Sequence, residues 1–98
     1  MNVSSISGMR PFEGSGAYCM SKAALIMMSQ VMALELAGEG IRVNVICPGM
    51  VEDTELGDVA EAALFLCSAE SSWMTGAVLP LDGGRHLTTN IPAPSSQA

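Results

Sequence analysis

The segment from Ala17 to Ala37 contains neither proline nor glycine, and alanine, leucine, methionine, lysine and glutamate dominate it. These residues favour a helix, which Gly38 and Gly40 end. Apolar side chains occur on nearly every side of this predicted helix. Because an apolar side has to be buried, we expect more than one face to be covered. One cover is a sheet, and the other is another subunit.

Strand-like segments lie on both sides of this predicted helix. Met1 to Ser5 reads as the end of a strand, and the run I-R-V-N-V-I from Ile41 to Ile46 has the β-branched composition of another. A strand, a helix and a strand in this order predict a right-handed parallel crossover. A second helix is expected from an N-cap at Asp58 to Cys67, and a third strand from Ala77 to Leu81. The fold class is therefore α/β.

Tyr18 and Lys22 lie four residues apart near the start of the long helix. Residues at this spacing share one helix face, so the phenol and the ammonium point into one space. A nearby positive charge stabilises a phenolate, which makes the pair a candidate acid/base unit. Taken alone, Y-x-x-x-K is common in helices, and an exposed lysine beside a half-buried aromatic ring is the simpler interpretation.

Three further motifs accompany this pair in a fixed order. Asn2-Val3-Ser4-Ser5 precedes it, and Asn44-Val45-Ile46-Cys47-Pro48-Gly49 and Asp82-Gly83-Gly84 follow it. Together the four motifs resemble the second half of a classical short-chain dehydrogenase/reductase, from Met1 to about Gly84. The resemblance implies part of a Rossmann-like doubly wound parallel sheet, with about three strands and two helices and without the dinucleotide-binding half.

The resemblance also implies roles for individual residues. Tyr18 is the general acid for a substrate carbonyl, Lys22 holds the nicotinamide ribose, and Ser5 hydrogen-bonds the substrate oxygen. The implied cofactor is NAD or NADP, and the substrate is a small carbonyl compound or alcohol. The residues implied to contact the cofactor are Tyr18, Lys22, Pro48, Gly49 and the backbone of Val51.

The sequence departs from the family pattern in three places. No glycine-rich turn of the form G-x-x-x-G-x-G occurs, and the upstream N-N-A-G stretch is missing. Only Met50 to Leu56 stand where the family inserts a helical lid, and Thr54 is one residue late for its usual cofactor contact. The resemblance thus predicts a truncated oxidoreductase that retains Ser5, Tyr18 and Lys22 and is inactive in isolation. Its substrate, and the choice between NAD and NADP, stay open.

Two other functions stay open as alternatives. The chain could be a non-catalytic interaction protein that pairs with a full-length relative through residues 17–37, as a homo- or hetero-oligomer. It could also be an epimerase or dehydratase of the extended branch, which shares Y-x-x-x-K. The N-V-S-S start and the D-G-G ending fit the classical branch better.

Composition argues against several partners and sites. The net charge of −6, with four basic residues, opposes binding to nucleic acid or to an anionic membrane. The longest uninterrupted apolar stretch, Ala23 to Met28, is far shorter than the ~20 residues that span a bilayer. Met1 to Gly8 lacks the pattern of a signal peptide. We therefore expect a soluble protein.

The remaining polar and sulfur residues support a cytoplasmic protein without a metal. Cys19, Cys47 and Cys67 are odd in number and lie in apolar surroundings, which suits a reducing compartment. The only histidine, His86, belongs to a tail over residues 85–98 that we expect to be disordered. Asn44 is interpreted as a partner for buried backbone. Asp82-Gly83-Gly84 is interpreted as a structural turn.

Overall fold

The computed structural model describes residues 1–49 and 56–87. The strands are β1 (Asn2–Val3), β2 (Val45–Pro48) and β3 (Val78–Leu81). The helices are α1 (Gly16–Leu36) and α2 (Leu56–Leu66), with single 3₁₀ turns η1 (Ile6–Gly8), η2 (Ala37–Glu39) and η3 (Ala69–Ser71). All strand pairs are parallel, in the order β1-β2-β3. The predicted α/β class, strand–helix order and parallel pairing are confirmed.

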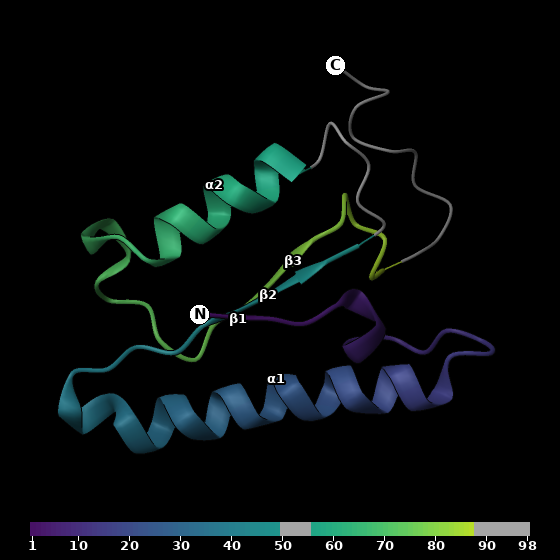
Figure 1. The fold of residues 1–98 in the computed structure, drawn as a ribbon, viewed down its shortest axis with the longest axis horizontal. Coiled ribbons are helices and arrows are strands. Elements are labelled where there is room, and N and C mark those ends of the chain that lie inside the picture. The colour runs from purple at the N-terminus through teal and green to yellow at the C-terminus, as the bar shows by residue number, and fades with distance from the viewer. Residues whose placement is uncertain (50–55, 88–98) are drawn as a thin grey trace.

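The two faces of the sheet are covered by different helices (Figure 1). Val45 and Cys47 of β2 point to the α1 face, where they form the core with Ile6, and Ile26 of α1 packs against this cluster. Successive strand residues point to opposite faces, so Ile46, only 1% exposed, lies on the α2 face. The site is therefore built on a sheet with one helix layer on each side.

This arrangement gives the two crossovers opposite hands. β1, β2 and β3 are parallel and follow one another across the sheet in chain order. The first crossover passes over one face through α1, and the second passes over the other face through α2 (Figure 1). Only one of them can obey the right-handed rule for parallel connections.

One stripe of α1 faces the sheet, and the rest of the helix is exposed. Ser29 and Ala33 are buried on the inner side. The outer side carries large apolar residues: Met20, Met27, Met28, Val31 and Leu34 are 44 to 81% exposed. The prediction that a sheet covers one face of the helix is confirmed. The predicted second cover stays a prediction.

The helical segment Gly16–Glu39 also passes a simple test for a membrane span. Its mean hydropathy is 1.3 over a window of which 11% is buried, and its 24 residues are long enough to cross a bilayer. Core helices of soluble proteins and signal sequences have the same length and composition. This property therefore assigns no membrane location.

Arg42 binds the C-terminal end of α2, a role that the sequence analysis missed. Its guanidinium donates to the carbonyl oxygens of Leu66 (3.2 Å) and Ser68 (3.2 Å), and to the carbonyl (2.8 Å) and hydroxyl (2.9 Å) oxygens of Ser71. The last carbonyls of a helix have no partner within the helix, and a cation there also interacts favourably with the negative end of the helix dipole. Arg42 thus fixes α2 to the start of the central strand.

Two structural interpretations of the sequence are confirmed, and one helix start is wrong. The Asn44 amide donates to the carbonyl oxygen of Met74 (3.0 Å) and accepts from the N–H of Ala77 (3.1 Å), so it does pair buried backbone. Asp82 opens a turn in which Gly83 and Gly84 have left-handed φ angles of 64° and 88°. Asp58 lies in the first turn of α2 rather than at its N-cap.

Candidate active site

The predicted site residues lie where the parallel strands end. Ser5 follows β1, Pro48 ends β2 with Gly49 directly behind it, and Asp82 follows β3. The carboxyl ends of parallel strands meet at one edge of a sheet, which is where open α/β sheets bind ligands. Tyr18 reaches the same edge from the first turns of α1.

A pocket of about 400 Å³ lies at the end of β3, but a smaller one is lined by two of the three predicted catalytic residues, Ser5 and Tyr18. Its volume is about 270 Å³, and its lining includes Ser5, Phe12, Tyr18 and Gly49. The chemistry of these side chains, rather than the size of the pocket, makes it the candidate active site. Residues from the first loop, from α1 and from the end of β2 thus meet in one cavity.

Lys22 and Tyr18 are in contact on one face of α1, as their spacing predicts. The Lys22 ammonium lies 5.3 Å from the centroid of the Tyr18 ring. A cation over an aromatic face is attracted by the ring and by any negative charge that develops on its oxygen. Tyr18 is 50% exposed, so its hydroxyl can exchange a proton with solvent. The predicted proximity of the two side chains is thus observed as a contact between the ammonium and the ring.

Ser5 has a structural bond that leaves its hydroxyl hydrogen available. It is the N-cap of η1, and its Oγ accepts from the N–H of Ser7 at 3.1 Å. A hydroxyl has one hydrogen and two lone pairs, and the cap uses a lone pair only. Ser5 therefore caps a local turn and can also donate into the pocket.

Gly49 is required by its neighbour Asp82. A Cβ atom built on Gly49 would lie 2.6 Å from the Cβ atom of Asp82. The resemblance implied a cofactor contact for Gly49, and the structure gives a reason for the glycine within the chain itself. Val51, which was also predicted to contact the cofactor, and Thr54 lie outside the described residues.

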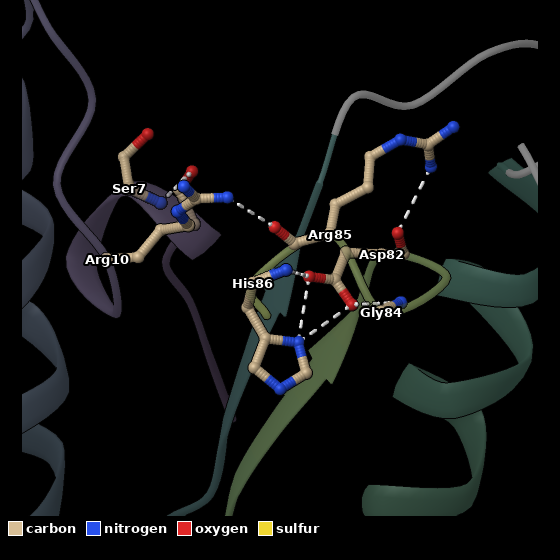
Figure 2. Close-up of polar contacts among 7 residues, drawn as sticks. Ser7, Arg10, Asp82, Gly84, Arg85 and His86 are labelled. Atoms are coloured by element: carbon tan, nitrogen blue, oxygen red, sulfur yellow. Dashed lines mark hydrogen bonds and ion pairs between the residues drawn. The ribbon is translucent and has the colours of Figure 1, made fainter. Parts of the chain in front are cut away.

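The carboxylate of Asp82 organises the turn after β3 (Figure 2). It accepts from the backbone N–H groups of Gly84 (3.1 Å) and His86, and one of its oxygens lies 3.0 Å from Nδ1 of His86. Arg10, just after η1, donates to the carbonyl oxygen of Arg85 at 3.0 Å. Arg85 and His86, which the sequence analysis assigned to a disordered tail, thus belong to a turn held by hydrogen bonds. Residues 88–98 lie outside the described part of the chain.

Cys47 lies beneath this edge and does not line the pocket. Burial raises the pKa of its thiol above the ordinary value of 9.0, and the negative charge of Asp82 raises it further. A hydrogen bond from the backbone of Ser5 acts in the opposite direction and is the weakest of the three causes. The thiol is therefore held in its neutral form and is a core residue.

The polar groups in and beside the pocket fit one end of a nicotinamide cofactor. Ser5 and Tyr18 line the pocket and offer a hydroxyl and a phenol, and Lys22 places an ammonium against the ring of Tyr18 rather than in the lining. Such donors suit ribose hydroxyls and a carboxamide. The sequence has no glycine-rich turn for a pyrophosphate, and the Ser15 side chain makes no capping bond at the start of α1. Among residues 1–49 and 56–87, no group of three metal-binding side chains occurs.

Known proteins are similar to this chain in both sequence and fold. The family described as "short chain dehydrogenase" matches residues 1–63, and that described as "Enoyl-(Acyl carrier protein) reductase" matches residues 52–86. The "Inactive 2-(S)-hydroxypropyl-CoM dehydrogenase 2" of Xanthobacter autotrophicus is 34% identical over 86% of the chain. The aligned length of 113 exceeds the 98 residues of this chain, so that relative has extra residues inside the matched region.

Solved structures agree with the sequence relatives. Acetoin dehydrogenase YohF from Salmonella typhimurium matches 90% of the chain with a TM-score of 0.83 and 30% identity. A 4-hydroxyisoleucine dehydrogenase complexed with NADH and succinate matches 83% of it with a TM-score of 0.76 and 33% identity. The chain spans 49% of the Xanthobacter protein and 42% and 41% of these two structures.

The parallel sheet, with one helix layer on each face, is an α/β fold of the Rossmann-like kind. The chain belongs to the short-chain dehydrogenase/reductase family, as the match over residues 1–63 shows. Proteins of this oxidoreductase family generally use NAD(P), act on small molecules and commonly form oligomers. The predicted family and partial Rossmann-like fold are confirmed.

Proposed function

We propose that Ser5, Tyr18 and Lys22 form the acid/base part of an NAD(P)-dependent site that interconverts a small carbonyl compound and an alcohol. The observation that carries this proposal is the shared pocket of Ser5, Tyr18 and Gly49, with Lys22 in contact with the Tyr18 ring. The relative complexed with NADH supports the choice of cofactor.

In the direction of reduction, the hydroxyl groups of Ser5 and Tyr18 donate hydrogen bonds to the carbonyl oxygen of the substrate. A nicotinamide bound beside these residues would supply the hydride for the carbonyl carbon. Tyr18 transfers its proton to the oxygen, which yields the alcohol and leaves a phenolate beside the Lys22 ammonium. Solvent then returns a proton to the half-exposed phenol. Oxidation of the alcohol runs through the same steps in reverse.

The isolated chain is proposed to bind the nicotinamide end weakly and not to turn over. It contains side chains for the ribose and the reacting oxygen but no pyrophosphate-binding turn, and it spans under half of the relatives described above. The parent activity would need the remaining part of such a fold. A cytoplasmic location, expected from the unpaired cysteines, belongs to the same proposal.

A fluorescence titration with NADH and NADPH tests this function, after circular dichroism has shown that the chain is folded. The proposal predicts a saturable change in reduced-nicotinamide fluorescence with wild-type chain and a loss of that change with Lys22→Met. Lys22→Arg, which keeps the charge, is the matched control and should retain part of the response. The same response from wild type and Lys22→Met would contradict the proposal.

The exposed outer face of α1 favours a second function, in association with another subunit. Met27 and Leu34 on this face are 59% and 81% exposed, and a monomer gains nothing from such a helix surface. We propose that α1 pairs with a second copy of this chain or with a full-length relative. The chain would then modulate its partner whether or not its own site is active.

A further inference from the structure

Ser4, the residue before the proposed catalytic serine, is tied to α1. Its side chain is buried, with 5% exposure, and its Oγ donates to the carbonyl oxygen of Lys22 at 2.8 Å. A carbonyl oxygen in a helix already accepts the N–H of the residue four positions later and has a second lone pair to offer. Ser4 occupies that second position without opening the helix.

Gly8, at the end of η1, rests against the same peptide group. A Cβ atom on Gly8 would lie 2.7 Å from the carbonyl carbon of Lys22, 2.8 Å from its oxygen and 2.8 Å from the nitrogen of Ala23. These are backbone atoms of a helix, which cannot move aside as a flexible side chain does. Gly8 is not among the residues with positive φ, so the position needs a glycine for its lack of volume rather than for its conformation.

We propose that Ser4 and Gly8 are positioning residues that set Ser5 against Tyr18 and Lys22. Both contact the Lys22–Ala23 peptide, and Ser5 lies between them in the chain. Tyr18 is one turn earlier on the same helix, so fixing this peptide also fixes the phenol relative to the Ser5 hydroxyl. The inference rests on the proposed function for the roles of Ser5, Tyr18 and Lys22.

These two contacts fix the distance between the Ser5 hydroxyl and the Tyr18 phenol in the pocket. A displacement of about 1 Å between reacting groups can lower a rate by about 100-fold. Ser5 is held by a short 3₁₀ turn, and a single turn has little rigidity of its own. Contacts with a long helix on both sides of Ser5 supply the missing rigidity.

Fluorine NMR of the folded chain tests this proposal without any turnover. Tyr18 is the only tyrosine, so incorporation of meta-fluorotyrosine gives a single probe in the pocket. The test variant is Ser4→Ala, and the matched control is Ser29→Ala. Like Ser4, Ser29 is buried (1% exposed) and donates to a carbonyl oxygen of α1, that of Leu25 at 2.8 Å. In addition, its Oγ accepts from the side-chain amide of Asn2 in β1 at 2.8 Å.

The proposal predicts that Ser4→Ala shifts or splits the Tyr18 fluorine resonance, while Ser29→Ala leaves it within one linewidth of wild type. Ser29→Ala should lower the melting temperature at least as much as Ser4→Ala, because the Ser29 hydroxyl makes two hydrogen bonds and the Ser4 hydroxyl one. Ser4→Cys, which keeps the volume but donates more weakly, should give a smaller shift in the same direction. It replaces Ser4→Ala if that variant does not fold.

Equal effects of Ser4→Ala and Ser29→Ala on the resonance, or no effect of either, would overturn the positioning role. This readout needs no cofactor, so it is independent of the cofactor titration that tests the proposed function. If Ser4→Ala shifts the resonance but the chain binds neither NADH nor NADPH, the positioning role is supported and the proposed function is contradicted. If the chain binds a cofactor but Ser4→Ala leaves the Tyr18 resonance unmoved, the proposed function is supported and the positioning role is contradicted.

Discussion

Asp82 packs so closely against Gly49 that position 49 has no room for a side chain. A Cβ atom on Gly49 would lie 2.6 Å from Cβ and 3.1 Å from Cα of Asp82. The contact joins the ends of β2 and β3 directly below the candidate active site. The position of Gly49 in the pocket therefore depends on the turn that Asp82 organises.

Gly49→Ala should destabilise the chain by about 1–3 kcal/mol, the usual range for overpacking in a tight site. The measurement is the free energy of unfolding from urea titration. Gly38→Ala is the control, because nothing lies within 4 Å of a Cβ atom at that position. The control should change the free energy by less than about 1 kcal/mol. Equal losses in the two variants would mean that the Asp82 contact is not the cause.

Arg42→Ala should cost about 2–4 kcal/mol, because it leaves several carbonyl oxygens at the end of α2 without their charged donor. Arg42→Lys should recover less than half of this loss, since an ammonium cannot reproduce the planar fork of a guanidinium. Urea unfolding measures both. Arg10→Ala removes one hydrogen bond, to the carbonyl oxygen of Arg85, and a contact with the Phe12 ring, and serves as the comparison. A loss for Arg10→Ala as large as that for Arg42→Ala would contradict this assignment.

Cys47 should make the chain less stable in alkali. Its pKa is raised in the folded state by burial and by Asp82, so the unfolded chain loses the thiol proton first. The stabilising contribution is complete below about pH 9 and is lost as the pH rises through the folded pKa. Urea midpoints from about pH 8 to about pH 11 should therefore fall more steeply in wild type than in Cys47→Ala. Cys67→Ala, which removes an exposed thiol, should keep the wild-type slope.

Leu34→Glu should weaken self-association or pairing with a full-length relative, because it places a charge on the outer face of α1. Leu34 is 81% exposed, so the substitution should not disturb the fold of the chain. Light scattering after size exclusion measures the change in mass. Leu64→Glu makes the same change at a residue of α2 that is 73% exposed and should leave the mass unaltered. A wild-type chain that is monomeric alone and does not co-elute with a full-length relative would contradict the pairing proposal.

The long helix and the order of the elements could be predicted from local composition. The predicted segment Ala17 to Ala37 and the observed α1, Gly16–Leu36, differ by one residue at each end. The central strand is less accurate, since Ile41 to Ile46 was predicted and Val45–Pro48 is observed. The Asn44 side chain accepts from the N–H of Ala77, and the Thr75 hydroxyl accepts from that of Val43, so side chains take bonds that a ladder would otherwise make.

The predicted site residues Ser5, Tyr18 and Gly49 do share a pocket, because motifs at the ends of parallel strands converge. The supporting contacts could not be read from the sequence. Ser4 meets Lys22 across 18 residues, Arg42 meets Ser71 across 29, and Arg10 meets Arg85 across 75. No local pattern encodes such distances, since they depend on how the layers pack.

The central claim is that Tyr18 and Lys22 hold the nicotinamide end of a cofactor. Its most direct test is a titration of fluorotyrosine-labelled chain with reduced nicotinamide mononucleotide, which lacks the adenosine half for which the sequence has no glycine-rich turn. The account predicts a saturable shift of the Tyr18 resonance, absent in Lys22→Met, with an affinity similar to that of NADH. A resonance that does not move, or that moves equally in wild type and Lys22→Met, would contradict it.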